Sequence, residues 1–159
     1  MRIFKGGLAL VFAAGFAGCV NDTQAQTPPK PATFSVTLGA DESFEPGAEA
    51  KLTPAAKAKL DGEVIAKAKE LSSVDLIVVS GHSDRLGDVA DNQKLSELRA
   101  EAVLEYLKSQ RIEASFMDAM GFGQTLPVKQ CPGEMSKTEM AACLAANRRV
   151  VVEVKGTPR

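Results

Sequence analysis

The sequence contains only one histidine, His82, and no excess of positive charge. With one histidine, neither a metal site built from several histidines nor histidine-based general-base catalysis has support. The 19 basic and 20 acidic residues give a formal net charge of −1, so no basic surface for nucleic acid is expected. The carboxylates are scattered without a convincing acid–base pair. We therefore predict no catalytic residue, no cofactor and no metal site, and we do not expect an enzyme.

The apolar run near the N-terminus, residues 8–18, is too short to cross a bilayer with ease. Arg2 and Lys5 precede it and turn-rich sequence follows, which is typical of a secretory signal peptide. The alternative, a buried core helix, accounts for neither flank. We expect residues 1–18 to direct export, and their removal leaves 17 basic and 20 acidic residues.

Two processing routes follow from the sequence after this run. Cys19 is preceded by Phe-Ala-Gly, and Ala-Gly-Cys is similar to the end of a bacterial lipobox, in which the cysteine thiol is lipidated. The position three before that cysteine is usually leucine, and here it is Phe16. The other route is cleavage after Ala25, where Thr23 and Ala25 supply small residues at the two required positions.

The three cysteines are an odd number for an exported chain. Cys131 and Cys143 lie close together in the sequence, and a disulfide between them would leave Cys19 as the odd thiol, which a lipid would occupy. Two free buried thiols are less expected in an oxidising compartment.

The rest of the chain divides into a tether and one domain. Residues 19–33 are polar and contain Pro28, Pro29 and Pro31, a composition that favours an extended linker. Residues 34–157 alternate strand-like and helix-like segments, and their length suits one modest core.

The hydrophobic periodicity predicts four strands and three helices in the order β-α-β-α-β-α-β. Strands are expected at residues 33–38, 76–79, 115–121 and 150–154, and the apolar run 76–79 is typical of a central strand covered on both faces. Thr53 and Pro54 begin the first helix, which continues with apolar residues at helical spacing. These residues are Leu60, Val64, Ala68 and Leu71.

The second helix is expected over residues 92–109 and the third over 137–146. The apolar stripe assigned to the second helix comprises Leu95, Leu98, Ala102 and Tyr106. The economical fold is a two-layer α/β (α+β) sandwich with the helices packed on one mixed sheet.

Polar residues that directly follow the central strand are the first candidates for a site. Asp84 lies in the segment Ser-Gly-His-Ser-Asp-Arg-Leu-Gly, at the expected rim of the sheet, where sites are commonly built. The alternative is a turn aspartate that binds its own backbone. On a helical wheel with Leu95 at zero, Arg99 falls near 40° and Asn92 near 60°, inside the apolar arc. A guanidinium on that side needs an anionic partner, unless it extends outward from the edge of the stripe.

These residues resemble the signature of the OmpA/MotB C-terminal (OmpA-like) domain family. The resemblance rests on Gly-His-Ser-Asp-Arg-Leu-Gly at 81–87, then Asn92, Leu-Ser at 95–96, Arg-Ala at 99–100 and Tyr-Leu at 106–107. Gly-Phe-Gly at 121–123 and Asn-Arg-Arg-Val at 147–150 extend it. A departure is Phe44-Glu45, where members often have phenylalanine and aspartate, so no ligand contact is carried over there. The layout is similar to a peptidoglycan-associated lipoprotein.

The resemblance implies non-covalent binding of peptidoglycan through the meso-diaminopimelate of its stem peptide. By position, Asp84 would receive the ammonium group and Arg99 the carboxylate, while Asn92 would shape the loop or touch the ligand. Arg149 would contribute from the last strand or form a structural salt bridge. Cys131 and Cys143 resemble the disulfide of OmpA proper.

This interpretation predicts that the protein lies on the periplasmic face of the outer membrane, held by a lipid on Cys19, or in the soluble periplasm without that lipid. It would anchor the outer membrane or a periplasmic protein to the wall. The alternative is a module that binds envelope proteins, such as a Tol-type partner, with little wall binding.

Overall fold

The computed structural model describes residues 30–159, and its centre is a four-stranded mixed sheet. The strands are β1 (Ala32–Gly39), β4 (Leu71–His82), β5 (Phe116–Gly121) and β6 (Arg149–Pro158), in the spatial order β1-β6-β4-β5. Strands β4 and β5 are parallel, and β6 is antiparallel to both β1 and β4. The expected signal peptide, Cys19 and the cleavage position after Ala25 lie outside the described residues. Strand β1 includes the last two residues of the predicted tether.

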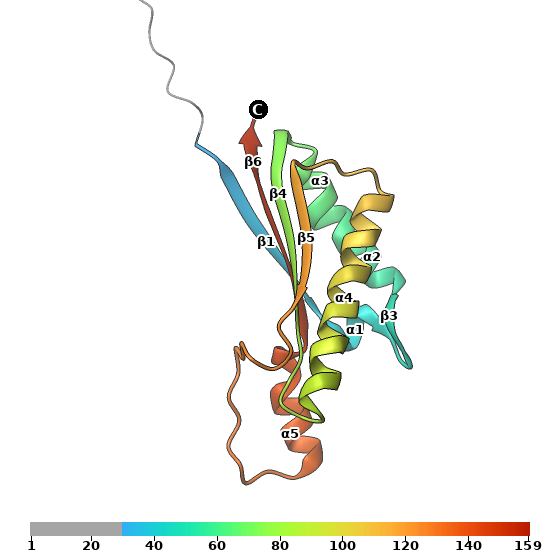
Figure 1. Cartoon of the computed structure of the whole chain (residues 1–159), viewed down its shortest axis with the longest axis vertical. Helices are drawn as coiled ribbons and strands as arrows, with labels where there is room; N and C mark the ends of the chain where they lie inside the picture. Colours follow the sequence, from blue (N-terminus) through green and yellow to red (C-terminus); the bar gives the residue numbers. More distant parts are fainter. Residues whose placement is uncertain (1–29) are drawn as a thin grey trace, which may run out of the picture.

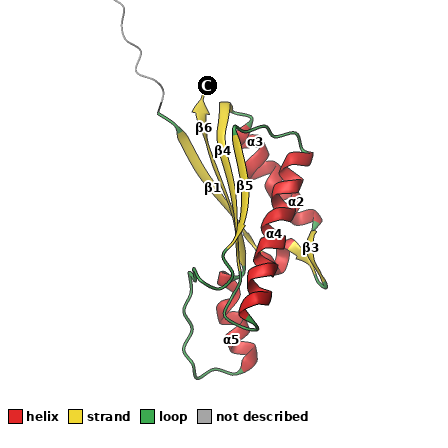
Figure 2. Cartoon of the chain, in the orientation of Figure 1, coloured by secondary structure: helices red, strands yellow, loops and turns green. Residues whose placement is uncertain are grey.

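Helices cover one face of this sheet, which confirms the predicted fold class (Figures 1 and 2). The first helical run comprises α2 (Pro54–Leu60), a π-helical turn η1 (Asp61–Ile65) and α3 (Ala66–Ala68). It begins as predicted, because the hydroxyl of Thr53 accepts a hydrogen bond of 3.2 Å from the backbone N–H of Ala56. Leu71 does not continue the helix and instead opens strand β4, which corrects the predicted C-terminal end.

The second helix, α4 (Val89–Ser109), buries a different face from the predicted one. Leu95, Leu98, Ala102 and Tyr106 are only half-buried. The buried positions are Asn92, Ser96, Ala100, Val103, Leu104 and Leu107. A Cβ on Gly81 would lie 2.0 Å from the carbonyl oxygen of Ser96, so the sheet and helix approach most closely where both carry small residues. The predicted stripe followed the large apolar residues, and a contact between small residues leaves no such pattern in the sequence.

The core lies between the sheet and these helices. Val150, Val152 and Val154 of β6 are fully buried, as the alternating pattern predicts, and so are Ile77 and Val79 of β4. The prediction that β4 is covered on both faces is wrong. The intervening positions Leu76 and Val78 are only half-buried, because the described helices do not cover that face.

Several short elements were not predicted. A helix α1 (Ala40–Ser43) and a two-stranded sheet of β2 (Phe44–Glu45) and β3 (Ala48–Leu52) stand between β1 and α2. The third predicted helix is divided into α5 (Lys137–Cys143) and a 3-10 turn η2 (Leu144–Asn147), which lie beyond the end of the sheet (Figure 1). Within residues 30–159, no helix combines the length and apolar character needed to cross a bilayer.

Candidate functional site

The candidate site lies at the end of the sheet where β4 finishes and β6 begins. The antiparallel register pairs His82 with Arg149, so the segment after β4 and the segment before β6 meet at this end. Asp84 comes from the first segment and Arg148 from the second. Asp84 is buried, with 6% of its surface exposed, although it is charged. A buried carboxylate of this kind requires a charged or hydrogen-bonding partner.

Arg148 supplies that partner and links two carboxylates. Its Nη1 lies 2.6 Å from Oδ2 of Asp84 and donates to the carbonyl of Ala141 at 3.1 Å. Its Nε and Nη2 donate to the two carboxylate oxygens of Asp41, the first at 2.7 Å. Hydrogen bonding to Arg148 lowers the pKa of Asp41, and the pairing raises the pKa of Arg148. One guanidinium therefore joins α1 to the loop after β4.

The loop that carries Asp84 is fixed by local hydrogen bonds. Oδ1 of Asp84 accepts from the backbone N–H of Leu86 at 2.8 Å, which is the turn role considered as an alternative for this residue. The buried amide of Asn92 donates to the carbonyls of Asp84 at 3.2 Å and Leu86 at 2.8 Å. Asn92, on α4, thus fixes the shape of this loop. The other carboxylate oxygen of Asp84, Oδ2, is left to pair with Arg148.

Arg99 approaches the same region from α4. Its guanidinium carbon lies 5.2 Å from the centre of the Phe44 ring. After the hydrogen bond and charge of Arg148, the charge of Arg99 also lowers the pKa of Asp41. The structure therefore brings two carboxylates, Asp41 and Asp84, and two guanidinium groups, Arg99 and Arg148, to one end of the sheet.

Arg149 has different surroundings from Arg148. It donates to the carbonyls of Asn147 and Leu126, each at 3.3 Å, and burial lowers its pKa. Because Val150 is buried in the core, Arg149 lies on the opposite face of β6. The prediction named Arg149 and missed Arg148, although the alternation of β6 side chains about Val150 distinguishes the two arginines. Asp41 was also missed, because it lies in a short helix without a recognisable pattern.

His82, the single histidine, is buried beside the site without contributing a positive charge. Its ring stacks on Phe122 with centroids 5.4 Å apart. Burial, and then the charge of Arg149, lower its pKa to about 4. Within the described part of the chain, no cluster of three or more histidine, cysteine, aspartate or glutamate residues could hold a metal ion.

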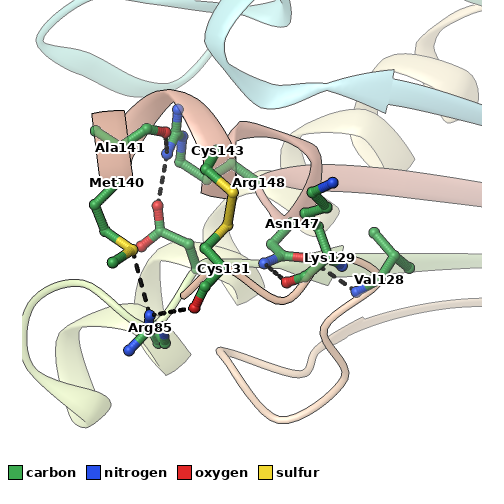
Figure 3. The surroundings of a disulfide bond; sticks show 10 residues. Arg85, Val128, Lys129, Cys131, Met140, Ala141, Cys143, Asn147 and Arg148 are labelled. Atoms are coloured by element: carbon green, nitrogen blue, oxygen red, sulfur yellow. Dashed lines mark hydrogen bonds and ion pairs between the residues drawn. A yellow bond between two sulfur atoms is a disulfide. The ribbon is translucent and has the colours of Figure 1, made fainter. Parts of the chain in front are cut away.

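A cavity of about 390 Å³ opens beside Asp84 and is walled by the loop between β5 and α5. The predicted disulfide between Cys131 and Cys143 is confirmed and ties this loop to α5 (Figure 3). Asn147, which is buried, accepts from the backbone N–H groups of Val128 and Lys129 and donates to the carbonyl of Lys129 at 2.8 Å. The loop is long, but the disulfide and these hydrogen bonds fix its conformation next to Asp84 and Arg148.

Comparisons with known proteins agree with this architecture. The model of the OmpA family matches residues 43–156. Outer membrane protein A from Shimwellia blattae is 41% identical over 93 residues, which cover 55% of this chain and 39% of that protein. The match therefore spans well under half of the length of that relative.

Two solved structures share the fold. The cell wall anchor of the T6SS from Pseudomonas aeruginosa is 26% identical, with a TM-score of 0.60 and coverage of 78% of this chain and 82% of that one. The periplasmic domain of Helicobacter pylori MotB is 17% identical, with a TM-score of 0.59 and coverage of 77% and 81%. At that identity, the MotB likeness concerns the fold alone.

Proposed function

The chain belongs to the OmpA family, and we propose that it anchors part of a bacterial cell envelope to the wall by binding peptidoglycan non-covalently. The observation that carries this proposal is the buried Asp84 facing Arg148 at an end of the sheet that also holds Arg99 and Asp41. The Pseudomonas structure, described as a cell wall anchor, supports the same role. The proposed function is that of a binding module and not of an enzyme.

The proposed ligand group is meso-diaminopimelate, whose free end carries an ammonium and a carboxylate. Asp84 receives the ammonium, and Arg99 receives the carboxylate. A sheltered site strengthens both contacts, because charge-assisted hydrogen bonds there compete with less water. A lysine side chain at the same place in a wall peptide offers the ammonium without the carboxylate and would bind less well.

Arg148 must be included in this scheme, because it already pairs with Asp84, the carboxylate that the ligand ammonium would bind. The ligand ammonium replaces Arg148 at Oδ2 of Asp84. The Arg148 guanidinium keeps Asp41 as its partner and turns to the ligand carboxylate beside Arg99. Each buried charge then retains an opposite charge, which limits the desolvation cost of binding. Asn92 contributes to binding by fixing the loop that carries Asp84. Arg149 contributes indirectly, because it holds the carbonyl of Leu126 in the loop that walls the cavity.

The test is co-sedimentation of the purified protein with wall sacculi. Wild-type protein should pellet with diaminopimelate-type sacculi and at least about tenfold less with lysine-type sacculi, because a lost charged hydrogen bond costs roughly 1.5–3 kcal/mol. Asp84→Ala and Arg99→Ala should stay in the supernatant while remaining folded by circular dichroism. Lys137→Ala, at an exposed position in α5, serves as the control. Equal pelleting of all variants would reject the wall-binding proposal and favour a protein partner.

The membrane attachment is a separate part of the proposal. A lipid on Cys19 would place the domain on the periplasmic face of the outer membrane, and cleavage after Ala25 would leave it in the periplasm. The intact mass of protein purified from membranes decides between them. Mass for a diacylglyceryl and an acyl group at Cys19 supports the lipid anchor, and an N-terminus at Gln26 contradicts it.

A further inference from the structure

The cavity beside Asp84 contains polar groups that the binding scheme above does not use. Its lining includes Ser83, Gln124 and Lys129 in addition to Asp84. Ser83 directly precedes Asp84 and is 95% buried, since only 5% of its surface is exposed. Gln124 and Lys129 come from the loop after β5, which the disulfide and Asn147 hold in place. One side of the cavity is therefore the sheet end, and the other is a fixed loop.

Two side-chain oxygens on residues that line this cavity are buried and lack a hydrogen-bond partner anywhere in residues 30–159. They are Oγ of Ser83 and Oε1 of Gln124. Buried polar atoms are nearly always paired, so two of them on residues that line one cavity suggest a ligand that pairs them. The amide oxygen of Gln124 can only accept and therefore requires a donor, such as the N–H of an amide. The hydroxyl of Ser83 can donate to a carbonyl or carboxylate oxygen.

The charge of the lining adds a third requirement. Lys129 and Arg85 both line the cavity, and together they outnumber the negative charge of Asp84, which Arg148 already partners. Nη2 of Arg85 donates to the carbonyl of Cys131 at 3.2 Å and contacts the sulfur of Met140, so its guanidinium is held against the loop (Figure 3). The cavity residues thus offer an acceptor for an N–H group (Gln124), a hydroxyl donor (Ser83) and positive charge. An amino acid that is linked through an amide and carries a carboxylate has the complementary groups.

We propose that this cavity is a second subsite, which binds the amide-linked, carboxylate-bearing amino acid next to the residue whose ammonium Asp84 holds. This inference rests on the proposed wall binding and specifies more of the ligand. In it, Gln124 accepts the amide N–H, Ser83 donates to the neighbouring oxygen, and Lys129 attracts the carboxylate. The disulfide-linked loop contributes a wall that is already in place before the ligand binds, which lowers the entropic cost of binding.

The experiment compares three ligands by calorimetry on the full purified protein. They are free meso-diaminopimelate, the wall tripeptide L-alanyl-γ-D-glutamyl-meso-diaminopimelate, and the same tripeptide with its glutamyl carboxylate converted to a carboxamide. Wild-type protein should bind the tripeptide about tenfold more tightly than the free amino acid. It should prefer the carboxylate form over the carboxamide form by roughly threefold, the range of a partly exposed ion pair.

Two variants separate the subsite from the clamp at Asp84. Lys129→Ala should abolish the preference for the carboxylate form. Ser83→Ala should weaken both tripeptides by about fivefold, as expected for one hydrogen bond, and leave free diaminopimelate unchanged. Its melting temperature should not fall, because the hydroxyl that it removes has no partner within the described chain. Lys137→Ala should match wild type throughout.

The outcomes distinguish this inference from the proposed function. If wild-type protein binds free diaminopimelate and both variants bind the tripeptides as wild type does, the second subsite is wrong and the clamp stands. If wild-type protein binds neither the amino acid nor the tripeptides, the proposed function fails and the subsite fails with it. If Ser83→Ala weakens free diaminopimelate and the tripeptides equally, Ser83 serves the clamp and the subsite is again wrong.

Discussion

The helix-covered sheet and the end that carries the candidate site (the site end) are held together by different forces. The sheet buries an apolar layer against α4, with Ile77, Val79 and Val152 fully buried. The site end is built from Arg148 bridging two carboxylates, the buried Asn147 and a disulfide, while α5 contains no buried residue. Apolar burial supplies most of the folding free energy, whereas fixed polar groups recognise ligands. Substitutions in the sheet should therefore change stability, and substitutions of the charged residues at the site end should chiefly change binding.

The largest effect is expected where α4 contacts the sheet. Gly81→Ala places a Cβ against the carbonyl of Ser96, a backbone atom that cannot move alone, and should destabilise the protein by about 3 kcal/mol or more. Urea unfolding measures the change. Gly62→Ala is the control, because its Cβ meets nothing within 4 Å. A Gly81→Ala protein as stable as wild type would mean that the contact is looser than described.

Removing the disulfide tests whether the site end adds to global stability. Cys131 and Cys143 are 12 residues apart, and the double serine variant should lose about 2–3 kcal/mol in the unfolding free energy. The midpoint of urea unfolding under non-reducing conditions measures the loss, with wild-type protein in reducing buffer as the matched comparison. An unchanged midpoint would show that the loop folds and unfolds independently of the sheet.

His82 makes the boundary between the two regions sensitive to acid. Its pKa is about 4 in the folded protein and 6.5 without burial, so the unfolded chain binds the additional proton between these values. Stability should therefore be constant above pH 6.5 and fall by on the order of 2 kcal/mol as the pH decreases toward 4. Thermal unfolding at several pH values measures this slope. His82→Phe should flatten it, and a slope that persists in that variant would assign it to other groups.

The smallest effect is expected at the start of α5. The hydroxyl of Ser136 and the carboxylate of Glu139 form a reciprocal capping box. Ser136→Ala should destabilise this helix by about 1 kcal/mol and speed amide hydrogen exchange there by roughly fivefold, with little change in β4. Thr138→Ala, at an exposed position of the same helix, is the control. Equal acceleration in β4 would show that the two regions unfold as one unit.

Sequence reasoning succeeded where a regular period sets the structure. The alternation of Val150, Val152 and Val154 correctly indicated the final strand β6, and the hydroxyl of Thr53 marked the start of α2. It failed on the buried face of α4, because close contact through Gly81 and Ser96 requires small residues and leaves no apolar signal.

The charged groups were only partly predictable. Asp84 and Arg99 were named from a motif, and both lie at the site end. Asp41 joins Arg148 across a sequence separation of 107 residues, a contact that only the folded chain reveals. Arg148 and Arg149 are adjacent and chemically identical. Their different surroundings follow from the alternating direction of side chains at the start of β6.

The most direct test of the proposed wall-binding site is a titration of the purified protein with meso-diaminopimelate, followed by the side-chain NMR signals of its arginines. We expect the guanidinium signals of Arg148 and Arg99 to shift together as the ligand replaces Arg148 at Asp84, and we expect Asp84→Asn to abolish both shifts. Arginine signals that do not change in wild-type protein, or that change equally in Asp84→Asn, would contradict the assignment of this charged cluster as the wall-binding site.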